Sequence, residues 1–590
     1  MRRFLLILSC FTVLAAQSSG KALDRIIATD ADAVLTVRNI SELRAAWKEH
    51  PLVLDLADTS LVDTISALIT PLGSATKPGG LDELLEEFHL DAEALLQLFP
   101  GQAGLVLYNF AEQILQDAES QDLAILAEFS GTPERLDELM QIQFERNAKA
   151  QKEANPEVEH ELIREYFMGE TLYFDEVFDG EKTYIEDGYA LVDGIFILAT
   201  PEERLRTLVE SIKAGTDAPL ASSPAYQRVR EASGPVDGLF YINFESFLPA
   251  LNQALLRGTV PAPMAMFGMS GSSLSAALAL RDWQGLGFDF KVQEDGLRAQ
   301  SAIIYREKSG LFKLLAYGEG ALPPAHYVPT GALSSSVSRF DLSEMFARLE
   351  AFLGAASPTA PALLNIQLQQ IKTNSGVDLR RALLQNFGTE VVSFSILPQK
   401  GPVGNPLAPA EQVYVFQIKD AAALSGGLEA LKDLVPGARG QIQTRDFGGE
   451  IIHTFSNAGA PTVGDVPAYN FSYVVTRTHL IASLGSIGTL QRVLTSMQSG
   501  DSGFWQEAEI EALIERVGAP GVVVARSYTD LGQALSSMLE SIQEAQQLTS
   551  RGSRISAPTS IDMPWHFLAE TYEAPDGLFS RMILQRKEAR

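Results

Sequence analysis

The side chains best suited to chemistry are the acidic ones between Glu153 and Asp187, where carboxylates are densest along the chain. Within this stretch Asp175-x-x-x-Asp179-Gly180 is followed by Glu186 at the twelfth position, a spacing that resembles the calcium loop of an EF-hand. The third position is Val177, however, and the flanking residues alternate as strands do. The pattern therefore predicts either a calcium-like site at Asp175, Asp179 and Glu186 or, more simply, a hairpin that turns at Asp179-Gly180.

The familiar catalytic signatures do not occur in this sequence. The seven histidines are scattered, and His160-Glu161 fails as the start of a zinc-protease helix because Arg164 stands where the second histidine is needed. There is no Gly-x-Ser-x-Gly motif, and Ser74-Ala-Thr-Lys77 lies in a glycine- and proline-rich stretch that we expect to be a loop. We therefore predict no catalytic residues, no cofactor-binding residues and no cofactor.

A second candidate site is apolar and lies in a loop of the first half of the chain. Methionine is adaptable and common at apolar binding surfaces. The matching loop of the second half, residues 541–561, is mostly polar. We predict that this loop docks an apolar ligand or partner; the alternative is that it packs against its own sheet or against the other copy. Its residues are Met264, Met266, Phe267 and Met269.

The elements that must position these residues occur twice along the chain. Leu95 and Leu383 each belong to a predicted helix that precedes an apolar strand, and they are 288 residues apart. Hairpins that begin at Tyr189 and Tyr473 are 284 residues apart, and the closing Asp-Gly pairs are 281 apart. This nearly constant separation predicts two diverged copies of one module.

The predicted fold class is α+β, with two antiparallel sheets, one per copy, each backed by amphipathic helices. Most strands alternate, and Asp-Gly pairs at 187/188, 193/194, 237/238 and 295/296 predict tight hairpin turns. Asn39 and Ser41 are placed to cap the first helix of the first copy, and Asp341 that of the second. The predicted segments are a signal peptide at 1–20, a first module at 21–308, a junction at 309–328 and a second module at 329–590.

The first residues predict export from the cytoplasm to the periplasm or the extracellular space. Met1-Arg2-Arg3 precedes an apolar run, and small and polar residues follow it, as in a secretory signal. Cleavage would remove Cys10, the single cysteine, which excludes disulfides and thiolate chemistry from the mature chain. The net charge of −28 repels nucleic acid, and no segment of the mature chain is predicted to span a membrane.

The layout resembles that of large exported proteins of unknown function in bacteria of the planctomycete and verrucomicrobial kind. The resemblance rests on the opening strand, Asp32-Ala-Val-Leu-Thr-Val37, and on the following helix, Ser41-Glu-Leu-Arg-Ala-Ala-Trp47. It implies no activity and supplies no functional residues.

These observations favour an exported, non-enzymatic protein that acts by binding, or as a scaffold, in the cell envelope or outside the cell. Its partner would be an unidentified protein or an apolar ligand. The alternative is an exported hydrolase whose carboxylates, such as Glu86 with Glu87 or Asp175 with Asp179, come together only in the fold.

Overall fold

The structure of this chain is a computed structural model that divides into two compact units. The described residues are 21–58, 97–110, 122–258, 268–357, 359–397, 411–434, 442–456, 470–500, 503–537 and 563–587. Unit 1 comprises the described residues among 21–53 and 68–254, together with Trp283–Arg306. Unit 2 comprises those among 54–67, together with Leu255–Asp282 and the residues from Glu307 onward.

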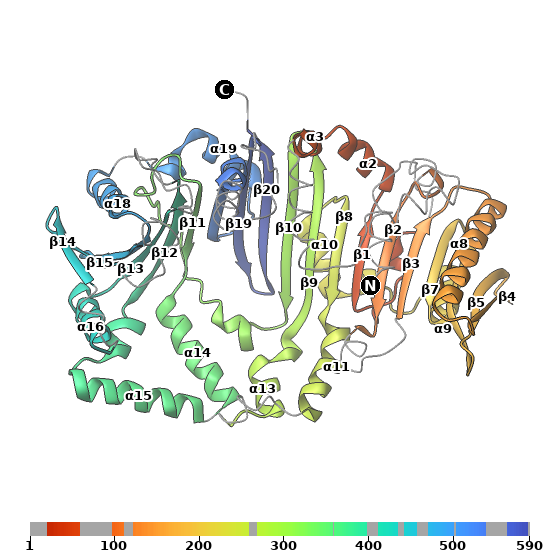
Figure 1. The fold of residues 1–590 in the computed structure, drawn as a ribbon, viewed down its shortest axis with the longest axis horizontal. Helices are drawn as coiled ribbons and strands as arrows, with labels where there is room; N and C mark the ends of the chain where they lie inside the picture. The colour runs from red at the N-terminus through yellow and green to blue at the C-terminus, as the bar shows by residue number, and fades with distance from the viewer. Residues whose placement is uncertain are drawn as a thin grey trace. The chain divides into compact units, whose positions relative to one another are not determined.

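Unit 1 is built on one antiparallel sheet of ten strands among its described residues. Their order across the sheet is β4-β5-β6-β7-β3-β2-β1-β8-β9-β10 (Figure 1). The bounds are β1 Ala33–Val37, β2 Ala103–Tyr108, β3 Asp122–Glu128, β4 Glu159–Phe167, β5 Glu170–Phe178, β6 Thr183–Val192, β7 Ile195–Thr200, β8 Gly238–Asn243, β9 Trp283–Gln293 and β10 Gly296–Tyr305.

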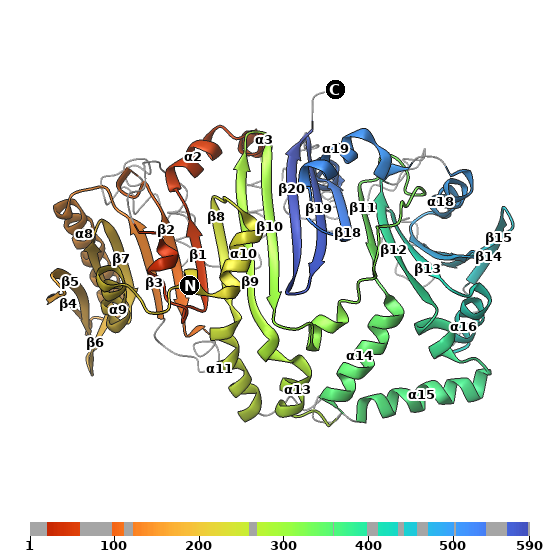
Figure 2. The ribbon, with the colours of Figure 1, turned by 180° about the vertical axis from the view of Figure 1, so that it is seen from behind.

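Helices cover both faces of the unit 1 sheet. On one face, α9 packs on β3, β6 and β7, and α10 packs on β9 and β10 (Figure 2). On the other face, Leu136 and Met140 of α8 pack against Tyr189 and Phe196. The bounds are η1 Leu23–Arg25, α2 Ile40–Lys48, α8 Pro133–Ala154, α9 Glu202–Ala214, η3 Leu220–Ser222 and α10 Pro224–Ser233; α3 Pro51–Asp58 and α11 Phe244–Arg257 begin in unit 1 and end in unit 2.

Unit 2 contains a sheet in which ten described strands have the same relative order. That order is β14-β15-β16-β17-β13-β12-β11-β18-β19-β20, again antiparallel throughout. Taken in chain order, each strand of unit 2 thus occupies the position of its counterpart in unit 1. The bounds are β11 Ser334–Arg339, β12 Phe387–Ile396, β13 Glu411–Ile418, β14 Ile442–Phe447, β15 Glu450–Ser456, β16 Asn470–Val475, β17 His479–Leu484, β18 Val523–Asp530, β19 Trp565–Ala574 and β20 Gly577–Arg586.

The main core of unit 2 lies between its sheet and helices α18 and α19. Leu490 and Val493 of α18 and Leu513 of α19 are buried against strand residues that include Val415 and Ile481. The bounds are α13 Gly271–Leu278, η4 Leu280–Asp282, η5 Gly310–Leu314, α14 Leu342–Ala356, α15 Thr359–Ser375, η6 Arg380–Leu384, α16 Ala421–Leu434, α18 Ile487–Ser499, η7 Phe504–Gln506 and α19 Ala508–Val517.

The predicted α+β class is confirmed: antiparallel strands and amphipathic helices form each unit. The shared order of strands is what an ancient duplication would leave, and the descent of both units from one module stays a prediction. The sequence assigned residues 255–282 to the first module, but they group with unit 2. One reason is that α13 packs on α14, where the Ser273 hydroxyl donates to the Ala356 carbonyl at 2.6 Å. The predicted module boundaries at 308 and 328 stay predictions.

The local predictions have mixed outcomes. Asn39 and Asp341 cap their helices as expected, accepting hydrogen bonds from the backbone N–H groups of the third helical residues. Of the four Asp-Gly pairs, 193/194 has positive φ at both residues, +50° and +80°, as a tight hairpin turn requires. The prediction was wrong at 187/188, which lies inside β6. A Cβ on Gly188 would lie 2.5 Å from the Phe174 ring, so this glycine permits close packing.

The other two Asp-Gly pairs also differ from the prediction. Gly238 and Gly296 begin strands β8 and β10, and neither pair has a positive φ. The hairpin between β9 and β10 turns instead at residues 294–295, because Gln293 pairs with Gly296. Within the part of the chain that the structure describes, we find no helix long and apolar enough to cross a membrane.

Candidate metal centre

The acidic stretch of the sequence forms one end of the unit 1 sheet together with α8. We call residues 133–192, which comprise α8, β4, β5 and β6, the acidic lobe (Figure 1). It contains 16 acidic and 6 basic side chains, which gives a net charge of −10. Thr132 caps α8 by accepting a hydrogen bond from the Arg135 backbone, and Pro133 occupies its first turn. Through these contacts the sequence fixes where the helix begins.

The three strands of the lobe are two consecutive hairpins. Met168 and Gly169 turn β4 into β5 with positive φ values of +48° and +90°. Between β5 and β6, the Asp179 carboxylate accepts hydrogen bonds from the backbone N–H groups of Glu181 and Lys182 at 3.0 Å. The hairpin reading of Asp179-Gly180 is therefore confirmed.

A β-bulge sets the position of Glu186. Asp175 pairs with Asp187 and Glu176 pairs with Ile185, so Glu186 is an extra residue in β6 without a partner in β5. A bulge of this kind breaks the strict alternation of side chains between the two faces of a sheet. As a result, the Glu186 carboxylate reaches the cluster that Asp175 and His160 form beneath α8.

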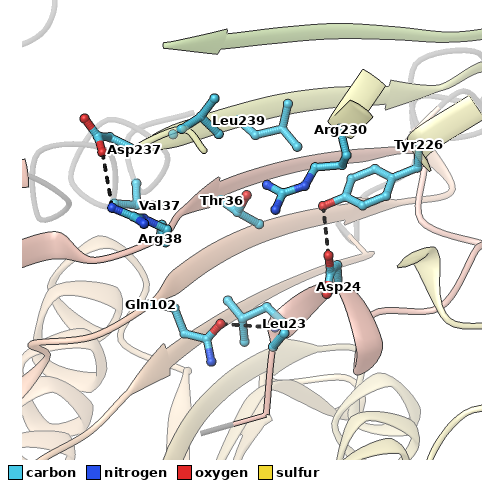
Figure 3. Close-up of a pocket in the computed structure, with 13 residues that line it drawn as sticks. Leu23, Asp24, Thr36, Val37, Arg38, Gln102, Tyr226, Arg230, Asp237 and Leu239 are labelled. Atoms are coloured by element: carbon cyan, nitrogen blue, oxygen red, sulfur yellow. Dashed lines mark hydrogen bonds and ion pairs between the residues drawn. The ribbon is translucent and has the colours of Figure 1, made fainter. Parts of the chain in front are cut away.

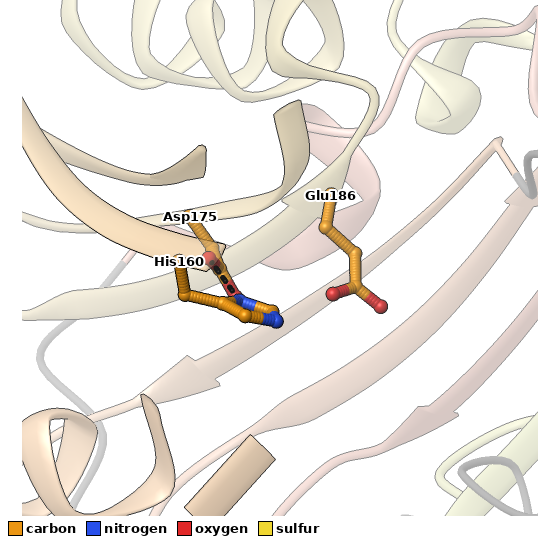
Figure 4. Close-up of side chains that lie close together, drawn as sticks. All are labelled: His160, Asp175 and Glu186. Atoms are coloured by element: carbon orange, nitrogen blue, oxygen red, sulfur yellow. Dashed lines mark hydrogen bonds and ion pairs between the residues drawn. The ribbon is translucent and has the colours of Figure 1, made fainter. Parts of the chain in front are cut away.

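His160, Asp175 and Glu186 form one cluster of possible metal ligands (Figure 4). Their donor atoms all lie within 4.8 Å of one another. The imidazole of His160 lies 2.8 Å, Nδ1 to Oδ1, from Asp175, and the two side chains are 1% and 5% exposed. Because a carboxylate can only accept, Nδ1 carries the proton in this bond.

The other ring nitrogen of His160 has no hydrogen-bond partner. His160 Nε2 is buried and unpaired, and in Figure 4 it points toward the side on which Glu186 lies. In the neutral imidazole this atom presents a lone pair near a carboxylate, an arrangement that is unfavourable without a positive charge between them. A cation bound at Nε2 would supply such a charge.

Helix α8 closes the cluster from above. The ring of Phe144 lies edge-on to the His160 ring, with 6.1 Å between centroids. Gln151 donates a hydrogen bond to Glu186 at 2.8 Å. Both α8 side chains therefore contact and restrain the cluster.

The structure regroups the residues that the sequence singled out. Asp175 and Glu186 come together, but Asp179 is outside the cluster, because its carboxylate holds the turn. Those backbone hydrogen bonds, from Lys182 and then Glu181, lower the pKa of Asp179. Calcium binding by Asp175, Asp179 and Glu186 stays a prediction, but in this structure His160, and not Asp179, lies with Asp175 and Glu186.

The role of His160 was missed from the sequence, although a signal was present. Once the β4–β5 turn is placed at Met168-Gly169, the register pairs Leu162 with Asp175, which makes His160 a diagonal neighbour of Asp175. The predicted loop of methionines is mostly outside the described residues, because Met264, Met266 and Phe267 are not described. The acidic pair Glu86 and Glu87 also lies outside the described residues. Met269 is half-buried, directly before Ser270, which caps α13.

The corresponding corner of unit 2 has a different chemistry. In unit 1, Tyr173 of β5 stacks on Tyr189 of β6, with 4.6 Å between centroids. In unit 2, His453 of β15 stacks on Tyr473 of β16 at 4.8 Å. The ammonium nitrogen of Lys432 on α16 lies 3.3 Å from His453 Nδ1. Burial is the larger cause that lowers the pKa of His453, and the charge of Lys432 is the smaller one. This corner therefore already contains a cationic side chain.

A small cavity of about 130 Å³ also lies in unit 1, between η1, β1, β8 and α10 (Figure 3). Two pairs of its polar side chains contact each other. The Tyr226 hydroxyl donates to Asp24 at 3.5 Å, and Arg38 lies 3.7 Å from Asp237. No histidine lines this cavity, so the cluster in the acidic lobe is the stronger candidate.

Comparisons with known proteins leave the chain without an assigned family. No family model matches it, and no curated protein matches it. Among solved structures, crystal form III of TP0453 is similar, with a TM-score of 0.21, 7% identity and coverage of 49% of this chain and 81% of that chain. Crystal form I of TP0453 has a TM-score of 0.21, 8% identity and coverage of 49% and 80%. These values indicate a weak likeness and say nothing about function.

Proposed function

We propose that this chain is an exported, non-enzymatic binding protein whose ligand is a divalent cation held in the acidic lobe of unit 1. The observation that carries the proposal is a contrast between the two units. The lobe has a net charge of −10, whereas its counterpart in unit 2, residues 421–475, has 5 acidic and 3 basic side chains and a net charge of −2. Because unit 2 builds the same order of strands without these charges, the fold does not require them.

Mutual repulsion makes such a concentration of carboxylates unfavourable unless cations offset it. Some of the lobe's acids have cationic partners, such as Glu165 with Arg206 and Glu170 with Lys213. Many of the others face solvent. A cation that entered the lobe would be attracted by this field and would meet donor atoms already held together beneath α8.

Burial of His160 and Asp175 favours binding over catalysis. A hydrolytic metal or carboxylate site needs an open position for water and substrate. Here the side chains of His160 and Asp175 are almost completely buried, and α8 lies above them. The carboxylate hydrolase that the sequence left open would have to move this helix before a substrate could enter.

The export expected from the N-terminal segment supports the same proposal. Residues 1–20 lie outside the described part of the chain, so the signal peptide and the envelope or extracellular location remain proposals. An exported chain without thiols in its mature form has no thiolate ligand, so nitrogen and oxygen donors are the main ones that it can offer a divalent cation. The cluster offers such donors.

Equilibrium dialysis of the mature chain, stripped with a chelator beforehand, tests this function. We expect one divalent cation per chain from a panel of Ca²⁺, Mn²⁺ and Zn²⁺. Glu161 and Glu176 pair across β4 and β5, and their replacement by Gln removes two negative charges. If each charge acts on the cation across about 10 Å of water at 0.1 M salt, their removal should weaken binding about three-fold.

The matched control is the double substitution of Asp446→Asn and Glu450→Gln at the unit 2 hairpin, which should leave the affinity unchanged. Absence of stoichiometric binding for every cation in the panel would overturn the proposed function. Equal weakening by the unit 2 control would also overturn it, because the charge of the lobe would then have no special role.

A further inference from the structure

We propose that the cation is a transition-metal dication of the zinc class, bound directly by His160 Nε2 and Glu186, with Asp175 as the residue that orients His160. This inference rests on the proposed function and names the ligand of the same site. It replaces the calcium-like set of Asp175, Asp179 and Glu186 that the sequence suggested.

The donor chemistry selects the class of metal. Calcium takes six to eight oxygen ligands, whereas an imidazole nitrogen together with carboxylate oxygens suits zinc and related metals. The exchange of Asp179 for His160 therefore changes the expected cation, because it replaces an oxygen donor with a nitrogen donor. Two donors bound to one zinc ion at 2.0–2.2 Å each lie about 4 Å apart or less. The cluster holds one donor atom of each of its three residues within 4.8 Å of the others, so binding is expected to draw the donor atoms closer together.

Asp175 prepares His160 for this role. Metal-binding histidines usually donate their second ring N–H to a carboxylate or carbonyl, which fixes the tautomer and the ring orientation. The 2.8 Å contact between His160 Nδ1 and Asp175 is of this kind, and it leaves Nε2 free to bind. Gln151 contributes in turn by donating to Glu186, so both ligands are held before the metal arrives.

Co²⁺ is the most direct probe, because its visible absorption reports nitrogen and oxygen ligands. We expect wild-type mature chain to bind one Co²⁺, Zn²⁺ to displace it, and a 100-fold excess of Ca²⁺ to leave it bound. His160→Gln and Glu186→Gln should each weaken Zn²⁺ binding by at least about 100-fold. Asp175→Asn should weaken it by about 10- to 100-fold and should also shift the Co²⁺ spectrum, which a merely structural role would not do.

Two matched controls separate this site from others. His453→Gln changes a histidine that stacks on an aromatic ring at the corresponding corner of unit 2, and Asp179→Asn changes the acid that the sequence suggested. Both should bind Zn²⁺ as the wild type does. Circular dichroism in the presence of chelator shows whether each variant is folded. A ¹H–¹⁵N spectrum of the His160 ring in wild type reports the protonation of Nε2 directly and needs no variant.

The outcomes distinguish this inference from the proposed function. If Ca²⁺ binds as tightly as Zn²⁺, or if His160→Gln binds Zn²⁺ like wild type, this inference is overturned while divalent-cation binding stands. If Nε2 of His160 stays protonated when Zn²⁺ is added, this inference is likewise overturned. If no cation binds, both proposals fail together.

Discussion

Acidification should destabilise unit 2 through His566 on β19. This side chain is 3% exposed, and burial, the largest influence, lowers its pKa from 6.5 to about 4. Glu509 of α19, with its carboxylate 3.4 Å from Nδ1, and Asp530 favour the charged form, whereas Lys587 opposes it. The balance keeps His566 neutral in the folded chain down to about pH 4.

The sign and size of the effect follow from these values. At pH 7 the ring is neutral in both states and contributes nothing. Between pH 6.5 and 4 the unfolded chain binds a proton that the folded chain does not, so stability falls as the pH falls. A difference of 2.5 pKa units, at 1.36 kcal/mol per unit, corresponds to a loss of about 3 kcal/mol, most of it complete by pH 4.5.

The assay is urea unfolding at pH 7.0 and 4.5, followed by the fluorescence of Trp505 and Trp565, which are both buried in unit 2. The substitutions Trp47→Phe and Trp283→Phe would remove the tryptophan fluorescence of unit 1. Between pH 7.0 and 4.5, the free energy of unfolding of His566→Phe should fall by about 2 to 3 kcal/mol less than that of wild type. The control is His326→Gln, at an exposed histidine of unit 2, which should behave as wild type. If wild type and His566→Phe lose equal stability on acidification, the reasoning is refuted.

Three further substitutions test the packing and the helix caps. Gly188→Ala places a methyl group 2.5 Å from the Phe174 ring and should lower the free energy of unfolding of unit 1 by about 1–3 kcal/mol; a thermal melt unchanged from wild type would contradict this. Ile481→Ala empties a fully buried position in the unit 2 core and should lower it by about 2–5 kcal/mol, whereas a loss below that range would mean that the core collapses around the gap. Asp341→Ala removes the carboxylate that accepts from the Glu344 backbone and should destabilise unit 2 by about 1 kcal/mol in urea; Asp341→Asn, which keeps an acceptor, should lose less.

Much of this fold could be predicted because its signals are local. Alternation marks strands, Asp193-Gly194 marks a turn, and Asn39 marks the start of a helix, since each depends on residues close in sequence. The repetition at a separation of 281 to 288 residues predicted two similar modules, and the two units have the same strand order. The grouping of residues 255–282 with unit 2 could not be predicted, because it depends on packing between α13 and α14.

The candidate site could be predicted only in part. Its carboxylates were conspicuous in the sequence, but the correct set depends on which residues face each other across β4, β5 and β6. The position of Glu186 depends on a bulge, and no residue type marks that bulge in the sequence. Gly188 was misread for a similar reason, since its role is to make room for Phe174 from the neighbouring strand.

The bulge at Glu186 also bears on how such a centre could arise. In unit 2 the described pairs of β15 and β16 run in uninterrupted register, from His453 with Tyr473 to Ser456 with Asn470. The ladder in unit 1 differs by a single additional residue. Insertion of one codon into a regular hairpin would thus place the Glu186 carboxylate beside His160 and the Asp175 that orients it. Deleting that codon would restore the regular ladder, so the centre could be gained or lost in evolution without rebuilding the sheet.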